Sequence, residues 1–286
     1  MQVTSFPVEI LISEDDSSDN TRGIVRDYAK RYPARIRLLL SKKNLRSNEV
    51  VRRGLRAARG RYIALLDGDD FWTSPHKLQT QVDFLLQHPE CSMCFHNAVV
   101  VDQEDREHSQ LWTPPHQKEM SELADIWSGN FIATCSAMLR AEYVRDVSEW
   151  YNPFFPITDW PLYIVSAERG PIGYLNEVMG AYRLHQGSMY SSLPNAKKLE
   201  SVATFYKRMN AVLDFRHDRM ARAGAAEFFF DWNEEYRRQE NLQLASYALK
   251  LCRESGGVGI SVAHRRYLRA WGTLLAQKIQ KLFAAS

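Results

Sequence analysis

Three aspartates fall within four residues in the segment Asp67-Gly68-Asp69-Asp70, directly after an apolar run. Carboxylates this close repel one another, so ionising all of them is costly unless a cation offsets the charge. Oxygen ligands in a compact turn suit Mg²⁺ or Mn²⁺, with phosphates of a substrate completing the coordination shell. The alternative is a structural turn, since Asp and Gly are both common in turns. The segment is a candidate metal site.

A second acidic segment ends another apolar run, and both runs belong to a repeating pattern of strands and helices. Apolar runs predict strands at 8–13, 36–40 and 62–66, and helical spacing of apolar residues follows each, near 24–29, 47–59 and 75–86. This alternation predicts parallel strands joined by right-handed crossovers. Ligands in such open α/β sheets bind outside the carboxyl ends of the strands. We therefore expect Glu14 and Asp15 to face the same crevice as Asp67 and Asp69.

The rest of the chain changes from mixed structure to helices. The pattern predicts a strand at 134–139, a helix from about 141, a helix opening near Asp159, and strands at 172–175 and 178–184. Beyond residue 193 it predicts helices alone, with a break in the Gly-rich stretch 254–259. We therefore expect two domains, an α/β domain at 1–194 and an α-helical extension at 195–286.

Composition excludes several classes of protein. The net charge is +3, which is too small for a globally basic nucleic-acid binder, so no nucleic acid is expected as a partner. The sequence contains no run of about 18 apolar residues and no recognisable secretory signal, so we expect a soluble, cytoplasmic protein. Four cysteines in 286 residues are too few for a disulfide scaffold.

Several segments, taken together and in this order, resemble one enzyme family. They are VEILISEDDSSDNT, RGRYIALLDGDDFW, SAMLR (136–140), TDWPLY (158–163) and IGYLNEVMGAYRLHQGS (172–188). The resemblance is to the family 2 glycosyltransferases of GT-A fold and covers roughly residues 6–194. It implies an α/β fold with a Rossmann-like, mostly parallel sheet flanked by helices, to which this chain adds the C-terminal helices.

The resemblance also implies an activity. Family members of this kind move a sugar from a nucleotide-diphosphate donor, here expected to be a UDP-sugar, to an acceptor hydroxyl with inversion. They use Mn²⁺ or Mg²⁺, and the acceptor is a glycan or a lipid-linked molecule in surface polysaccharide or glycan biosynthesis. The expected location is the cytoplasm, with peripheral contact to the cytoplasmic face of the membrane as an open possibility.

Site residues follow by position within the matching segments. Asp15 resembles the carboxylate that binds uracil, and Glu14 beside it supports the loop. Asp67 and Asp69 correspond to the D-x-D pair, in which the first acid approaches the ribose and the second ligates the metal that bridges the diphosphate. Both belong to the expected metal set, and Arg53 is a weaker candidate for contact with the donor.

Two further positions complete the expected site. Asp159 occupies the place of the catalytic base, and as it precedes Pro161 at a predicted helix start, its alternative role is a helix N-cap. His185 is a candidate third metal ligand, because neutral imidazole could bind the metal or the diphosphate. Arg183 could instead supply the contact to phosphate.

The C-terminal helices suggest a partner. Residues 195–286 hold 16 basic against 9 acidic residues, and from Tyr267 to Phe283 an apolar stripe runs between basic residues. We expect this stripe to pack against the domain or a second subunit, forming a homodimer, in preference to lying on an anionic membrane.

The sequence departs from the family pattern at its beginning. The family's first strand and helix, with a nucleotide-contacting loop, are not found before residue 8. Loss of a central parallel strand would expose strand edges. Two hypotheses stay open: the true start lies upstream, or the chain is a catalytically impaired relative that acts as a binding or scaffold protein.

Overall fold

The computed structural model describes residues 2–185, 187, 189–190, 192–259 and 264–284, with the side chains of 109, 264–265 and 281–284 also outside the description. Gln186 and Ser188 of the expected motif therefore lie outside the described residues. The chain divides into two compact units, Met1–Leu123 with Phe131–Ser191, and Ala124–Asn130 with Ser192–Ser286. The predicted domain boundary after residue 194 stays a prediction.

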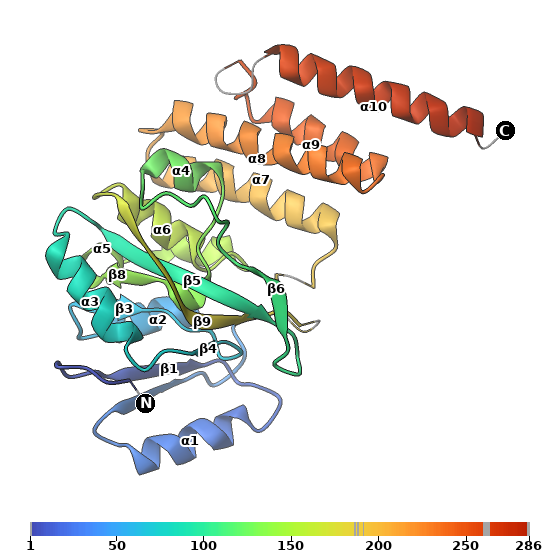
Figure 1. The fold of residues 1–286 in the computed structure, drawn as a ribbon. Helices are drawn as coiled ribbons and strands as arrows, with labels where there is room; N and C mark the ends of the chain where they lie inside the picture. Colours follow the sequence, from blue (N-terminus) through green and yellow to red (C-terminus); the bar gives the residue numbers. More distant parts are fainter. Residues whose placement is uncertain (1, 186, 188, 191, 260–263, 285–286) are drawn as a thin grey trace. The chain divides into compact units, whose positions relative to one another are not determined.

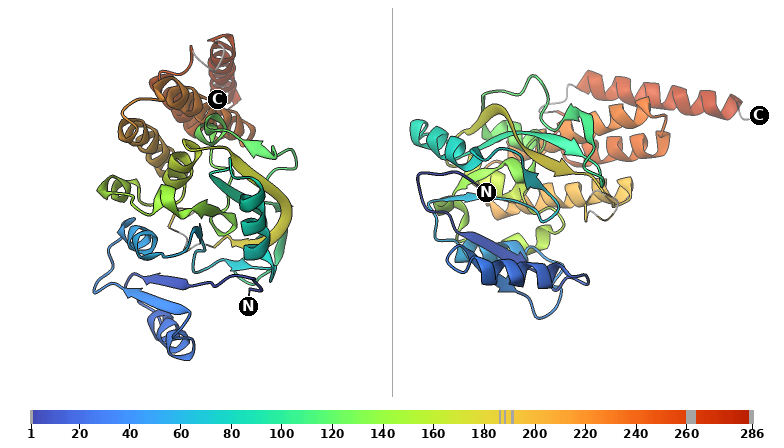
Figure 2. Two further views of the ribbon diagram at one scale, coloured as in Figure 1. Left: turned by 90° about the vertical axis from the view of Figure 1, so that its left-hand side faces the viewer. Right: turned by 60° about the horizontal axis from the view of Figure 1, so that its bottom comes forward.

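The first unit begins with a small parallel sheet of two strands. Its elements are β1 (Ile10–Glu14), α1 (Thr21–Arg31), β2 (Ile36–Leu40) and α2 (Glu49–Ala57). The register pairs Ile10 with Ile36, and α1 and α2 cover opposite faces of this sheet (Figures 1 and 2). The prediction of parallel strands is confirmed for this pair. The apolar run of the sequence ends with β1, and acidic loop residues follow it directly.

A larger mixed sheet forms the rest of the first unit. Its strands follow the order β3-β8-β5-β9-β4, with β6 paired to β5 and β7 to β9. They are β3 (Tyr62–Ala64), β4 (Phe71–Trp72), β5 (Met93–Val101), β6 (Glu107–Leu111), β7 (Met120–Ser121), β8 (Met138–Arg140) and β9 (Ile172–Arg183). Strands β5 and β9 pair in parallel and the other pairs are antiparallel. The mixed α/β fold with helices around a sheet is confirmed.

The expected pairing of β3 is wrong, because β3 joins β8 in the larger sheet and is not paired with β1 or β2. Short helices connect the strands: α3 (Lys77–Gln87), α4 (Leu123–Ser128), α5 (Ala141–Val144) and α6 (Trp160–Ala167), with 3₁₀ helices at Thr134–Ser136 and Glu149–Phe154. The predicted strand at 134–139 therefore begins only at Met138. The two strands predicted at 172–184 form one long strand, β9.

The second unit is helical, as the sequence predicts. After the segment of α4 it contains α7 (Asn195–Val212), α8 (Asp218–Arg238), α9 (Leu242–Glu254) and α10 (His264–Ala284). Phe229 and Phe230 are buried between these helices, and the Tyr206 hydroxyl donates to the Trp127 carbonyl at 2.8 Å. Within the described part of the chain, every helix is too short or too polar to cross a bilayer.

A buried arginine closes the C-terminal end of α3. The Arg140 guanidinium donates to the carbonyl oxygens of Leu85 at 2.9 Å and Cys91 at 2.7 Å, and also reaches those of His88 and Pro89. Arg140 is 6% exposed. The last carbonyls of a helix lack partners inside the helix and carry partial negative charge, so a cation there satisfies them and offsets the dipole.

We predict that Arg140→Met lowers the free energy of unfolding by about 3 kcal/mol, because buried carbonyl groups lose charge-assisted hydrogen bonds. Urea unfolding measures the change. The control is Arg106→Met, whose side chain is 74% exposed and which should change stability by less than about 0.5 kcal/mol. Equal stability of the two variants would show that Arg140 does not brace α3.

Candidate functional site

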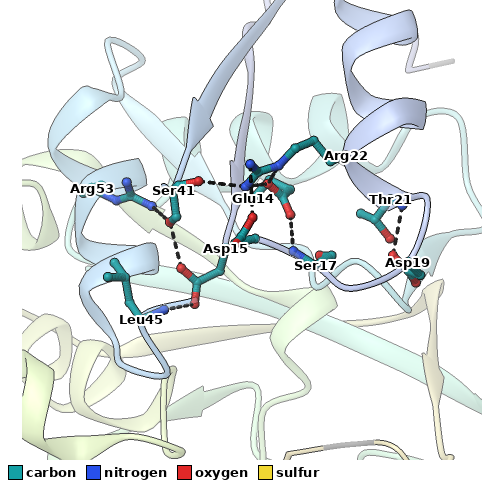
Figure 3. A network of polar contacts seen from close by, with 10 residues as sticks. Glu14, Asp15, Ser17, Asp19, Thr21, Arg22, Ser41, Leu45 and Arg53 are labelled. Atoms are coloured by element: carbon teal, nitrogen blue, oxygen red, sulfur yellow. Dashed lines mark hydrogen bonds and ion pairs between the residues drawn. The ribbon is translucent and has the colours of Figure 1, made fainter. Parts of the chain in front are cut away.

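The end of β1 is fixed by an ion pair. The Glu14 carboxylate, 3% exposed, accepts from the Ser17 backbone at 2.6 Å and from the Arg22 Nε at 2.6 Å (Figure 3). Arg22 also donates to the Ser41 carbonyl at 2.7 Å, which ties α1 to the end of β2. Desolvation alone would raise the pKa of Glu14, but the bonds from Ser17 and Arg22 hold it below the usual value.

Asp15 faces the loop that follows β2. Its carboxylate accepts from the Ser41 hydroxyl at 2.7 Å and from the Leu45 backbone at 2.9 Å (Figure 3). The Arg53 guanidinium, from α2, donates to the same Ser41 hydroxyl at 2.7 Å. Ser41 is thus the link between Arg53 and Asp15. The arrangement brings Glu14, Asp15 and Arg53 to the ends of two adjacent parallel strands.

The acidic turn after β3 is held by an arginine from β9. Arg183 donates from its backbone to the Asp70 carboxylate at 2.8 Å and from Nε to the Asp69 carbonyl at 2.8 Å. Its other guanidinium nitrogens contact the Asp102 carbonyl at 2.8 Å and the Asp105 carboxylate at 2.6 Å. In this structure Arg183 therefore braces the turn, and its donors are engaged by the protein.

Negative charge accumulates in this turn. Desolvation, followed by the charges of Asp70, Asp159 and Asp69, raises the pKa of Asp67 to about 7, although the residue is exposed at the surface. Burial, opposed in part by the Arg183 backbone bond, raises the pKa of Asp70 to about 6. A group that resists ionisation for these reasons becomes easier to ionise when a cation is placed beside it.

Thr134 connects the acidic turn with Asp159. Its single hydroxyl hydrogen is shared between the Asp159 carboxylate, at 3.3 Å, and the Asp67 side chain. Asp159 is the N-cap of α6, where its carboxylate accepts from the Trp160 backbone at 2.7 Å. The alternative structural role of Asp159 is therefore present, and it coexists with a position next to Asp67.

His185 lies against the middle of the acidic turn. Its Nε2 is 2.8 Å from the Asp69 carboxylate, and the two side chains are 23% and 40% exposed. Among the described residues, no three His, Cys, Asp or Glu side chains are arranged to hold a metal ion. The chemistry of the residues still fits a divalent cation, because Asp67, Asp69 and Asp70 offer hard oxygen donors whose mutual repulsion a cation would offset.

The predicted residues thus fall into two groups. Glu14, Asp15 and Arg53 share contacts through Ser41, whereas Asp67, Asp69, Asp159 and His185 lie around the acidic turn. The hydrogen bonds above do not link the two groups, so their convergence on one ligand stays a prediction. It was expected from neighbouring strands of one sheet, but β1 and β3 lie in different sheets.

Sequence reasoning missed three residues that hold the site together: Arg22, Ser41 and Thr134. Ser41 directly follows the strand 36–40, so the rule that ligands lie at carboxyl ends of strands could have identified it. Thr134 carries no such signal, because it lies at the start of a predicted strand and not at the end of one. Arg22 acts through tertiary contacts that local pattern does not reveal.

Comparison with known proteins identifies the family. The model described as "Glycosyl transferase family 2" matches residues 1–147, about half of the chain. The chain belongs to glycosyl transferase family 2. The resemblance seen in the sequence motifs is therefore confirmed at the level of the family, and the family 2 chain described here has the expected mixed α/β fold.

Relatives of this family 2 chain include proteins without assigned function. An uncharacterized protein of Mycobacterium tuberculosis is 37% identical over 191 residues, which are 67% of this chain and 54% of the relative. An uncharacterized glycosyltransferase of Nostoc is 27% identical over 255 residues, 86% of this chain and 77% of the relative. The chain therefore spans about half the length of the mycobacterial relative.

Solved structures similar to this chain include the following one. It is a mannosyltransferase from Pyrobaculum calidifontis, in complex with GDP-Man and Mn²⁺, with 13% sequence identity and a TM-score of 0.49. The match covers 99% of this chain and 81% of the mannosyltransferase.

We predict that Glu14→Gln lowers the free energy of unfolding by about 1–3 kcal/mol at pH 7, since Arg22 loses its buried charged partner and keeps only the more exposed Asp16. A carboxyl whose folded-state pKa is depressed stabilises the fold above its unfolded pKa, and this contribution disappears as the pH falls through the folded value. The difference between wild type and variant should therefore shrink as pH falls below about 4.5, the ordinary value for Glu.

Urea unfolding at a series of pH values tests this prediction. Glu104→Gln is the control, because that carboxylate is 65% exposed and its pair with Arg106 should contribute little at any pH. A difference between Glu14→Gln and wild type that stays constant from neutral to acid pH would contradict the assigned role of the ion pair.

Proposed function

We propose that this family 2 chain is an inverting glycosyltransferase that moves a sugar from a nucleotide-diphosphate donor, a UDP-sugar, to an acceptor hydroxyl. The observation that carries the proposal is the hydroxyl of Thr134, which touches both Asp67 of the acidic turn and Asp159. A group able to bind the donor and a group able to accept a proton are therefore adjacent. We further propose a glycan or lipid-linked acceptor in surface polysaccharide synthesis, with the enzyme acting in the cytoplasm.

The nucleoside part of the donor would be bound near the end of β1. Glu14, Asp15 and Arg53 would contact or support the nucleoside, and the rigid network through Ser41 supports this role because it fixes their orientation. A preorganised site spends less free energy on ordering its own side chains when the ligand binds. Asp67 would approach the ribose.

The diphosphate needs positive charge, which the described side chains around the acidic turn do not provide in excess. Asp69, with Asp67 and His185, would hold Mn²⁺ or Mg²⁺ here. Such an ion, when bound, offsets charge on the departing diphosphate. The raised pKa of Asp67 supports the proposal, because desolvation and then the charges of neighbouring acids oppose its ionisation, and a bound cation would offset both effects.

Asp159 would activate the acceptor. Its carboxylate takes the proton from the acceptor hydroxyl while that oxygen forms a bond to the anomeric carbon, and the bond from this carbon to the diphosphate oxygen breaks. The position of Asp159 at the N-terminus of α6 supports this role, because the helix dipole favours a negatively charged group there by about 0.3–1 kcal/mol. Inversion follows from attack opposite the leaving group.

We predict different losses for the two acids. Asp69→Ala should abolish both transfer and metal-dependent binding of the donor, whereas Asp159→Asn should reduce transfer by about 10²–10⁴-fold and leave donor binding nearly unchanged. Calorimetric titration of UDP-sugars with and without Mn²⁺ measures binding, and mass spectrometry of products measures transfer.

Asp83→Asn is the matched control, because it removes an exposed carboxylate on α3 that bonds only Gln79 among the contacts described, and it should leave both quantities unchanged. Equal loss of donor binding in Asp69→Ala and Asp159→Asn would contradict the assigned roles. Metal-independent or absent binding of every UDP-sugar by the wild-type chain would favour the alternative, a homologue that acts as a binding or scaffold protein.

Thr134 generates a separate prediction as a positioning residue. Thr134→Val should lower kcat by about tenfold with little change in the donor KM, because Asp159 loses the hydroxyl that orients it. Thr134→Ser, which keeps the hydroxyl, should restore most of kcat. Steady-state kinetics of the three proteins provide the test, and identical kcat values for the Val and Ser variants would show that the hydroxyl does not position Asp159.

A further inference from the structure

The helix α10 presents two different faces. Its inward face packs on other helices of the second unit. Ala270 and Leu274, on this face of α10, are 4% and 5% exposed. Arg266 stacks over the Phe230 ring of α8 at 4.7 Å, and the Arg237 guanidinium donates to Gln277 at 3.4 Å. These contacts fix which side of the helix turns toward α8 and α9 (Figure 1).

The outward face of α10 carries large apolar side chains in contact with solvent. Leu268, Trp271, Leu275 and Ile279 are 51%, 55%, 44% and 44% exposed. Their spacing of three or four residues places them on one side of a helix of 21 residues. We call these four residues the outer stripe. Leu282, expected in the same stripe, has a side chain outside the described residues.

The charge around the outer stripe is of one sign. The sequence holds no Asp or Glu from Ser255 to Ser286, while Arg269 and Lys278 are exposed on either side of the stripe. An acidic residue of α8, Asp231, interacts with the charge of Arg266 on the inward face. An apolar stripe flanked by basic residues is complementary to a surface with an apolar interior and negatively charged groups at its boundary with water.

We propose that the outer stripe docks on an anionic phospholipid bilayer, with α10 lying in the plane of the interface. Trp suits the interface between the lipid acyl chains and the head groups, since its ring is apolar and its N–H is polar. Lys and Arg side chains reach from this interface to the lipid phosphates. A second copy of the chain fits less well, because two outer stripes in contact bring like charges together. The proposal does not depend on the proposed function.

The test uses the full chain and vesicles in a flotation assay. Wild-type protein should bind vesicles that contain about a quarter phosphatidylglycerol in phosphatidylcholine, and should bind pure phosphatidylcholine vesicles at least about tenfold more weakly. Raising the salt concentration should weaken binding to the anionic vesicles, since it screens the attraction.

Two variants separate the apolar and the charged contributions. Trp271→Ser with Leu275→Ser should lower partitioning at least about tenfold, while the control Leu86→Ser with Leu111→Ser, at positions 55% and 46% exposed, should not. Arg269→Glu with Lys278→Glu should abolish the preference for anionic lipid. Its control, Lys30→Glu with Arg106→Glu, makes the same change in net charge at exposed positions elsewhere.

Several results would overturn the proposal. They are absence of binding to anionic vesicles at low salt, equal binding to both vesicle types, and stripe variants that bind as well as their controls. Sedimentation equilibrium gives one more: a wild-type dimer that Trp271→Ser with Leu275→Ser dissociates would show that a second copy covers the outer stripe. The charge-reversal pair keeps the test decisive if the serine pair fails to fold.

Discussion

Electrostatic repulsion among carboxylates is the constraint on which the candidate site depends. Asp67, Asp69 and Asp70 follow one another in the chain, and the charge of Asp159 reaches Asp67 from another element. Without other contacts, these neighbouring carboxylates would move apart or take up protons. The bonds from Arg183 to the Asp70 carboxylate and the Asp69 carbonyl, and the hydroxyl of Thr134, oppose separation. Desolvation is the largest cause of the raised pKa values of Asp67 and Asp70, and the charges of neighbouring acids raise them further.

The acids at the end of β1 are stabilised by an ion pair and hydrogen bonds within the protein. There Glu14 is buried with a full partner in Arg22, and Asp15 has its oxygens engaged by Ser41 and the Leu45 backbone. These carboxylates have their partners within the protein, whereas Asp67 in the acidic turn, among the contacts described, faces other acids and the Thr134 hydroxyl. The contrast explains why we assign the cation to the acidic turn and a supporting role in nucleoside binding to the acids of β1.

Local features of the structure could be predicted well from sequence. The strand 36–40 matches β2 at both ends because an apolar run is bounded by polar residues, and Asp159 caps α6 because Asp before Pro161 is a strong N-terminal signal. The small and apolar residues of the segment TCSAML predict a strand that includes Thr134, but its first residues form a 3₁₀ helix. The parallel pairing of β1 with β2 could be predicted from their alternation with helices. The pairing of β3 was beyond reach, because its partner β8 lies more than 70 residues later and no local pattern encodes it.

The central claim is that the acidic turn binds the divalent cation that contacts the diphosphate of the donor. A crystal structure of the chain grown with UDP and Mn²⁺, with anomalous scattering measured for manganese, tests it most directly. We expect one manganese peak bonded to a carboxylate oxygen of Asp69 and to the diphosphate. UDP bound in the crystal with its manganese away from Asp69, or with no manganese at all, would contradict the account.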